Sequence, residues 1–209
     1  MLNLRDLAKS NEQILWEGRP KKSVTILEGI FNPMLVFAII WGAFDMLFMG
    51  GALWSGDKAA IAFMIPFLLI HMMPVWIYLG GVLTVFFRWR NTHFMITTGG
   101  LYISGGVFTF NYEMKPWTDI GHINIHQGIF DRMFGVGDVV FICNHMHTNS
   151  NNHGSAEKHM NIKNIPDFMQ VFKMVNNLQT DVYADTMYPN ALRPDTNPGY
   201  NSQYTNNFR

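Results

Sequence analysis

Charge is scarce in this sequence of 209 residues. Asp, Glu, Lys and Arg together make up 14% of the chain, well below the roughly 25% of an ordinary soluble domain. The 15 basic and 15 acidic residues cancel, so the chain lacks the basic excess with which proteins bind nucleic acid. A large surface that does not meet water is therefore expected, which argues against an ordinary soluble enzyme and against disorder.

Cysteines and catalytic motifs are also lacking. The sequence has one cysteine, Cys143, which excludes an intrachain disulfide and any metal site that needs several cysteines. It contains no Walker-type glycine loop, no G-x-S-x-G and no H-E-x-x-H, motifs with which many enzymes bind phosphate, attack esters or hold zinc. We therefore predict a protein that is not an enzyme and has no resident cofactor.

Two long apolar runs are present. Residues 33–54 contain one charged side chain, Asp45, and residues 61–87 contain no Asp, Glu, Lys or Arg. Each run exceeds the roughly 20 residues that cross about 30 Å of hydrocarbon as a helix. A buried helix of a soluble protein is the alternative, but such helices rarely stay apolar on every face over this length. We predict a transmembrane helical hairpin over residues 33–90, with spans at about 33–54 and 61–87.

Basic residues flank these runs unevenly. The loop between the runs has one cation, Lys58, whereas the outer flanks have seven, namely Arg5, Lys9, Arg19, Lys21, Lys22, Arg88 and Arg90. Positive flanks stay on the cytoplasmic side of a membrane. We therefore expect a multi-pass protein of the inner (cytoplasmic) membrane with both termini in the cytoplasm. The inner membrane of an organelle is the alternative.

Asp45 and His71 form a predicted polar pair within the hairpin. At 1.5 Å per residue, each lies about 20 Å along its helix from the turn, so both have a similar depth. A carboxylate in hydrocarbon is costly unless it is paired or neutralised. The pair is either a proton or ion site or a bond that holds the two helices together, and we favour the second interpretation because one pair is not a relay chain.

Residues 91–180 have a different pattern. Apolar and polar residues alternate, most plainly from Val107 to Lys115, and paired glycines separate the runs. This period of two is typical of antiparallel strands joined by tight turns. From Pro166 the period becomes helical, with an apolar stripe of Phe168, Val171, Phe172, Val175 and Leu178. We predict an α+β membrane protein in which six or seven antiparallel strands are closed by this helix, with Phe172 buried.

Three stretches of the sequence read EGRP from Glu17, MKPWTDI from Met114 and INIHQGIFDRMFGVG from Ile123. They resemble motifs of the membrane-anchored bacterial pleckstrin-homology-like (PH-like) domain family. The resemblance implies an antiparallel split β-barrel capped by a C-terminal helix, and a role at a membrane. It supplies no catalytic motif.

The third stretch contains three residues that we expect to shape a loop. Arg132 lies between two phenylalanines, and Gly135 and Gly137 follow it. Glycine allows the chain to bend sharply, and Asp131 or a nearby carbonyl could hold the guanidinium group of Arg132. We interpret this set as structural.

Residues 91–180 have few basic side chains with which to bind an anionic ligand. Eukaryotic PH domains that bind phosphoinositides carry Lys or Arg around their first hairpin, whereas the corresponding turn here, residues 97–100, has no cation. Acidic residues slightly outnumber basic ones over this region. Neither phosphoinositide nor nucleic-acid binding is expected.

One histidine-rich segment suggests an alternative. Cys143, His145 and His147 alternate, so on a continuing strand they would share one face. Thiolate and imidazole ligands suit copper or zinc. The alternative function is therefore a metal-binding or redox-accessory membrane protein. The competing interpretation is a solvated polar loop, which we favour.

The two ends of the chain complete the prediction. Residues 1–32 are expected to form a cytoplasmic segment, and residues 181–209 a tail rich in Asn, Pro and Tyr that is disordered or bound to a partner. The tail carries four potential contact residues: Tyr183, Tyr188, Tyr200 and Tyr204. Our leading hypothesis is a non-enzymatic scaffold or accessory subunit. Its partners would be the lipid bilayer and either other membrane-protein subunits or further copies of itself.

Overall fold

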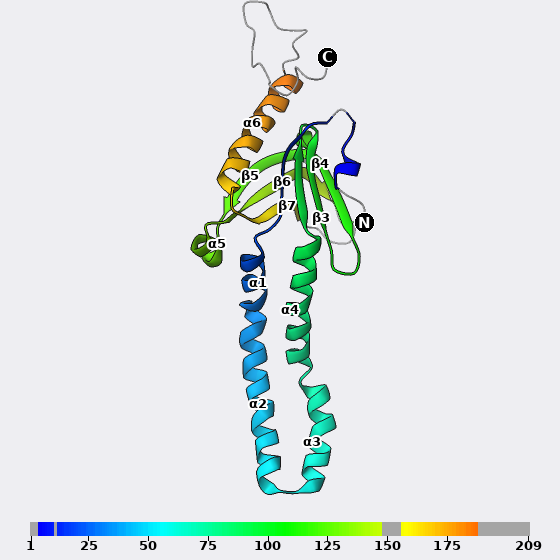
Figure 1. Ribbon diagram of the computed structural model, residues 1–209, viewed down its shortest axis with the longest axis vertical. Coiled ribbons are helices and arrows are strands. Elements are labelled where there is room, and N and C mark those ends of the chain that lie inside the picture. The colour runs from blue at the N-terminus through cyan, green and yellow to red at the C-terminus, as the bar shows by residue number, and fades with distance from the viewer. Residues whose placement is uncertain (1–3, 11, 148–155, 188–209) are drawn as a thin grey trace, which may run out of the picture. The chain divides into compact units, whose positions relative to one another are not determined.

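The computed structural model describes residues 4–10, 12–147 and 156–187. For residues 144–147, 156–158 and 183–187 it describes the backbone but not the side chains. The chain divides into two compact units (Figure 1). The hairpin unit comprises Thr25–Arg90, and the sheet unit comprises Met1–Val24 together with Asn91–Arg209. The two units are described separately below.

The hairpin unit is built from helices. Their bounds are α1, Lys22–Ile30; α2, Pro33–Ser55; α3, Lys58–His71; and α4, Met73–Asn91. The side chain of Asn32 caps α2 by accepting from the backbone N–H of Met34 at 2.9 Å. Gly56 ends α2 in the left-handed conformation at φ 64°, which glycine adopts without steric cost. Asp57 then caps α3, so a very short turn reverses the chain.

The second arm of the hairpin is not one continuous helix. α3 and α4 meet at a bend of 47°, close to Pro74. Proline has no N–H, and its ring crowds the carbonyl four residues earlier. The carbonyl of Ile70 accepts from the N–H of Met72 instead. The predicted second span at 61–87 is therefore broken into two helices.

α2 is the one described helix that is long and apolar enough to cross a membrane by itself. α3 and α4 reach that length only when they are taken together across their bend. The surface of α2 is unusual, because its large apolar side chains point outward while the carboxylate of Asp45 is buried.

The sheet unit contains two antiparallel sheets among the described residues. The first has the order β1-β2-β3-β4 and the second the order β5-β6-β7. The strands are β1, Ile14–Gly18; β2, His93–Thr97; β3, Gly100–Gly105; β4, Asn111–Pro116; β5, Ile120–His126; β6, Gly137–His147; and β7, Ala156–Ile165. Short helices are η1, Leu4–Leu7; η2, Trp117–Asp119; and α5, Ile129–Phe134, and the long helix α6 spans Phe168–Met187.

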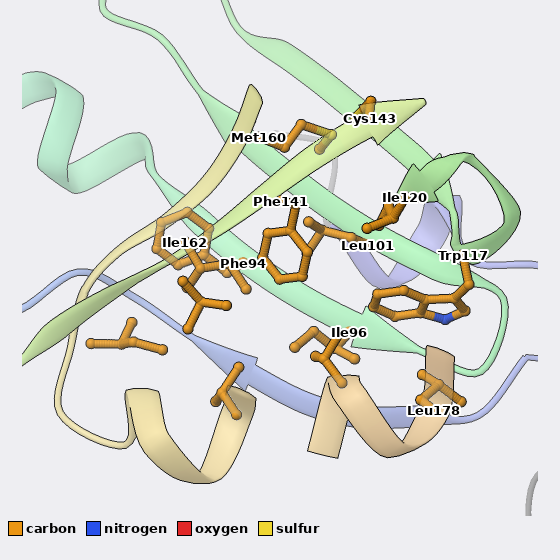
Figure 2. Packing of buried hydrophobic residues seen from close by; sticks show 14 residues of the cluster. Phe94, Ile96, Leu101, Trp117, Ile120, Phe141, Cys143, Met160, Ile162 and Leu178 are labelled. Atoms are coloured by element: carbon orange, nitrogen blue, oxygen red, sulfur yellow. The ribbon is translucent and has the colours of Figure 1, made fainter. Parts of the chain in front are cut away.

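One apolar core joins both sheets and α6. Figure 2 shows Phe94, Ile96 and Leu101 of the first sheet facing Phe141 and Ile162 of the second. The long helix closes this core with three fully buried side chains, which are Val171, Val175 and Leu178. Mixed strands and helix around one core are consistent with a PH-like domain.

Four expectations about the sheet unit need correction. Phe172 is only half-buried, because the buried face of α6 runs through its neighbours Val171 and Val175. The strand expected from Val107 begins at Asn111, after a loop that Gly106 opens at φ 134°. α6 continues to Met187, beyond residue 180. Residues 14–18 are not a separate segment, because β1 pairs with β2.

Candidate functional site

The hairpin contains the polar contact that the sequence predicts. The Oδ1 atom of Asp45 lies 2.7 Å from the Nδ1 atom of His71. Asp45 lies within α2 and His71 is the last residue of α3, directly before the bend. The two side chains therefore join the arms of the hairpin at the point where the second arm loses helical continuity.

Two aromatic rings surround the imidazole of His71. The indole of Trp41 stacks on it at a centroid distance of 5.0 Å, and the ring of Phe67 stacks on it at 4.8 Å. Trp41 precedes Asp45 by four residues and Phe67 precedes His71 by four, so each ring lies one turn away on the same helix face. The indole Nε1 of Trp41 also donates to the carbonyl of His71 at 2.9 Å. These contacts fix the orientation of the imidazole.

This arrangement can hold one proton between a carboxylate and an imidazole. The side chain of Asp45 is 2% exposed, and its second oxygen, Oδ2, has no hydrogen-bond partner among the described residues. His71 is partly exposed. A relay needs a chain of such groups, whereas residues 33–54 and 61–87 offer no further Asp, Glu, Lys, Arg or His. The contact therefore fits a bond between helices better than a proton path.

The connection from β5 to β6 is the second candidate site. The carboxylate of Asp131 accepts from the N–H of Gly128 at 2.7 Å, and the side-chain amide of Gln127 donates to the carbonyl of Val136 at 2.7 Å. Gly135 ends α5 at φ 65°. Asp131 and Gln127 hold this connection, whereas Arg132 is exposed and forms no ion pair within the described residues. Asp131, which the sequence offered as a partner for Arg132, binds the backbone of Gly128 instead. Gln127 was not among the loop residues that the sequence singled out.

Gly137 is the first residue of β6 and lies next to Phe168, the first residue of α6. A Cβ atom at this position would lie 2.8 Å from the ring of Phe168, which is closer than real Cβ contacts. Packing between β6 and α6 therefore favours glycine here. The sharp bend expected at Gly137 is absent, because its φ is not positive, whereas Gly135 has that conformation.

One group of side chains in this connection could hold a metal ion. Ligand atoms of His126, Asp131 and Asp138 lie within 4.8 Å of one another, because His126 and Asp138 are paired across β5 and β6. One oxygen of each carboxylate is already an acceptor: Asp131 bonds Gly128, and Asp138 bonds the N–H of Asn164 at 2.8 Å. His126 is exposed. Asp131 and Asp138 therefore serve as hydrogen-bond acceptors for backbone N–H groups, which is a structural role.

The predicted cysteine–histidine set is only partly described. Cys143 belongs to the buried core, and the pairing of β6 with β7 shifts between Ile142 and Met146. A shift of this kind interrupts the alternation on which a shared face depends. The side chains of His145 and His147 lie outside the described residues. So do the side chain of Tyr183 and the whole of Tyr188, Tyr200 and Tyr204.

The N-terminal segment supplies a polar cluster that sequence reasoning missed. The Oε2 atom of Glu12 accepts from the hydroxyl groups of Thr97 at 2.8 Å and Tyr102 at 2.9 Å. Burial, and then the hydrogen bond to Glu12, raise the pKa of Tyr102 to about 12. Nothing local in the sequence pairs Glu12 with a residue 90 positions later. The cluster ties the N-terminal segment to β2 and β3.

A cavity of about 290 Å³ opens beside β1 and β2. Its walls include Glu17, Arg19 and His93. Glu17 is paired with Arg5 at 2.7 Å, which holds the pKa of the Glu17 carboxyl below its ordinary value, chiefly through the hydrogen bond. Arg19 donates to the ring nitrogen Nδ1 of His93 at 3.1 Å. The lining therefore has no excess of positive charge for an anionic ligand.

Comparison with known protein families gives a match. Residues 24–179 match the model of a family described as "Bacterial PH domain". No curated protein and no solved structure matches the chain. The matched segment covers most of the chain and includes the hairpin unit, Thr25–Arg90, and the strands β2 to β7, whereas β1 precedes it.

Proposed function

Because the chain belongs to the bacterial PH domain family, we propose that it is a non-enzymatic module that a helical hairpin anchors in a membrane. PH domains are generally non-catalytic modules, and the contacts described above hold the fold together rather than assemble reactive groups. In this proposal the protein is a scaffold or accessory subunit that docks a larger membrane protein assembly. The bacterial inner membrane is its proposed location, with both termini in the cytoplasm.

The main support for this proposal is that α2 exposes its large apolar side chains and buries its one carboxylate. Within one turn of this helix, Asp45 is 1% exposed while Leu47 is 75% exposed. A helix in water does the opposite, because burying apolar surface and hydrating charge both stabilise it. In hydrocarbon, apolar side chains favour the outside and polar groups favour the helix contact. The arrangement of α2 and α3 follows the second rule.

The glycines of the hairpin support docking to other helices. At Gly50 and Gly51 of α2, and at Gly80 and Gly81 of α4, a Cβ would meet no described atom within 4 Å apart from the adjacent residues and the backbone of its own helix. Small residues let helix backbones approach closely in a membrane. Surfaces of this kind fit a neighbouring membrane helix, from another subunit or from a second copy.

Extraction of membranes tests the anchor. The full chain should remain with the membrane after washing with alkaline carbonate and should be released by detergent. A matched variant, Leu47→Arg, places a charge at an outward position of α2, costing about 2.5–3.5 kcal/mol at the centre of a span, and should weaken retention. Asp57→Asn, in the turn, should not. Release of the native chain by carbonate would contradict the proposal.

Native mass spectrometry of the detergent-extracted chain tests the docking. The expected result is a complex with other membrane proteins or with further copies, and its mass identifies which. A chain that stays a bare monomer under conditions that preserve other membrane complexes would contradict the scaffold role and leave the anchor intact.

A further inference from the structure

Exposed apolar side chains of the sheet unit gather in two places. Phe108 is 91% exposed, Ile129 is 80% exposed and Met133 is 72% exposed, and these are the three most exposed large apolar side chains of this unit within the described residues. Phe108 lies in the loop between β3 and β4 together with the exposed Phe110. Ile129 and Met133 lie one turn apart on α5 and so share a face.

The β3–β4 loop is bonded to the residue where the chain leaves the hairpin. The side-chain amide of Asn91 donates to the carbonyl of Gly106 at 3.1 Å, and the hydroxyl of Ser104 donates to the carbonyl of Asn91 at 3.3 Å. Asn91 is covalently joined to the hairpin unit, which ends at Arg90. Phe108 follows Gly106 by two residues, so it lies within about 7 Å of Gly106 along the chain.

α5 is bonded to the residue where the chain enters the hairpin. The Nζ atom of Lys21 donates to the carbonyl of Phe134 at 3.0 Å, and this ammonium group lies 5.7 Å from the centre of the Phe134 ring. The N–H of Lys21 donates to the carbonyl of Asn164 at 2.8 Å, which fixes its backbone. α1 begins at the next residue, Lys22.

Each anchor point adjoins a helix of the hairpin along the chain, because Lys21 directly precedes α1 and Asn91 is the last residue of α4. Phe86 and Phe87, which are exposed, lie about 6 to 8 Å along α4 from Asn91. The exposed apolar surface of α4 therefore extends nearly to Asn91, the residue to which the β3–β4 loop is bonded.

We infer that the sheet unit rests on the lipid surface through two contacts, the β3–β4 loop with Phe108 and Phe110 and the helix α5 with Ile129 and Met133. This inference rests on the proposed membrane anchor. Aromatic and long apolar side chains partition into the interface between headgroups and acyl chains, and adjacent lysines extend to the headgroups. Figure 1 shows α5 and the loop joining β3 to β4 at the same end of the sheet unit, as one flat surface requires.

A lipid surface fits these exposed apolar side chains best, because in the proposed anchor it surrounds the hairpin, which adjoins both Lys21 and Asn91 along the chain. A protein partner would have to contact two elements that are bonded to separate points of the chain, Lys21 and Asn91. The bilayer surrounds the hairpin and meets both without further assumptions. The two contacts would limit the tilt of the domain relative to the membrane.

A fluorescent probe at single cysteines tests this contact. The full chain with Cys143 replaced by Ala carries an environment-sensitive dye at one of four substituted positions: Phe108→Cys, Met133→Cys, Leu47→Cys or Asn177→Cys. Asn177 is exposed on α6 and is the control in water, and Leu47 is the control in hydrocarbon. Each protein is reconstituted in phosphatidylcholine vesicles with or without a lipid that bears a nitroxide quencher near its headgroup.

The dye at Phe108 and at Met133 should emit at shorter wavelength than the dye at Asn177, and the nitroxide lipid should quench it. Emission at both positions that equals that at Asn177 would overturn the inference. The dye at Leu47 separates the two proposals. If Leu47 is shielded from water and Phe108 and Met133 are not, only the surface contact is wrong; if Leu47 is also in water, the membrane anchor is wrong.

Discussion

Asp45 and His71 contact each other at 2.7 Å across 26 residues of sequence, at the end of a helix that Pro74 interrupts. A helix end leaves carbonyl groups without intrahelical partners, and the indole of Trp41 binds the carbonyl of His71 there. The side-chain pair and this hydrogen bond thus both connect α2 to the bend. The contact joins the two arms of the hairpin where the second arm bends by 47°.

Removing either partner should weaken the hairpin, and removing both should cost less than the sum. We expect Asp45→Asn and His71→Gln to couple by about 0.6–2 kcal/mol, the range of side-chain bonds between membrane helices. Unfolding of the detergent-solubilised chain by increasing SDS measures each variant. As a control, Asp45→Asn with Asp57→Asn should be additive, because Asp57 caps α3 at the turn. Strict additivity of the first pair would show that the contact does not stabilise the hairpin.

The buried face of α6 predicts an order of stability losses. Leu178→Ala should destabilise the sheet unit by about 2–5 kcal/mol, because it empties a fully buried position. Phe172→Ala should cost roughly 2 kcal/mol or less, since a half-buried ring leaves a smaller cavity. Denaturant unfolding followed by circular dichroism measures both. A larger loss for Phe172 than for Leu178 would place the wrong face of α6 against the sheets.

Gly137 should not tolerate a side chain. Gly137→Ala brings a Cβ atom to 2.8 Å from the ring of Phe168, and overpacking of this kind costs about 1–3 kcal/mol. Gly128→Ala is the matched control in the same connection, because its Cβ would meet nothing closer than 3.4 Å. Thermal unfolding compares the two variants. Equal midpoints would mean that Phe168 moves aside freely.

The raised pKa of Tyr102 predicts that the folded chain loses stability at high pH. Its pKa is raised from 10.0 to about 12 in the folded chain. The neutral phenol is therefore favoured by the fold, so its contribution is complete below pH 10 and is lost as the pH rises toward 12. Absorbance at alkaline pH should show one tyrosine that ionises late, and Tyr102→Phe should remove that step. Tyr112→Phe, at a residue of β4, should leave it in place.

The sequence predicted contacts well where the geometry was local or periodic. The equal depth of Asp45 and His71 followed from a helical rise and a short turn. The alternation of apolar residues and the stripe on α6 gave the strands and the closing helix. The match over residues 24–179 confirms the bacterial PH-like domain that three stretches suggested.

The sequence predicted poorly where distant segments meet. β1 pairs with β2 across the whole hairpin, and no local pattern shows a pairing between strands so far apart. Phe108 and Phe110 mimicked the alternation of a strand, although Gly106 opens a loop before them. His126, Asp131 and Asp138 come together only through the register of β5 and β6, which alternation alone does not determine.

Labelling of single cysteines in intact bacterial cells tests the membrane anchor most directly. Ser55 is exposed at the turn of the hairpin and Asn177 is exposed on α6, while the native Cys143 is buried and the native chain gives the background. A membrane-impermeant thiol reagent should label Ser55→Cys in intact cells, and should label Asn177→Cys only after the cells are permeabilised. Labelling of Asn177→Cys but not Ser55→Cys in intact cells would contradict the topology. Protection of both until permeabilisation would contradict a hairpin that crosses the membrane.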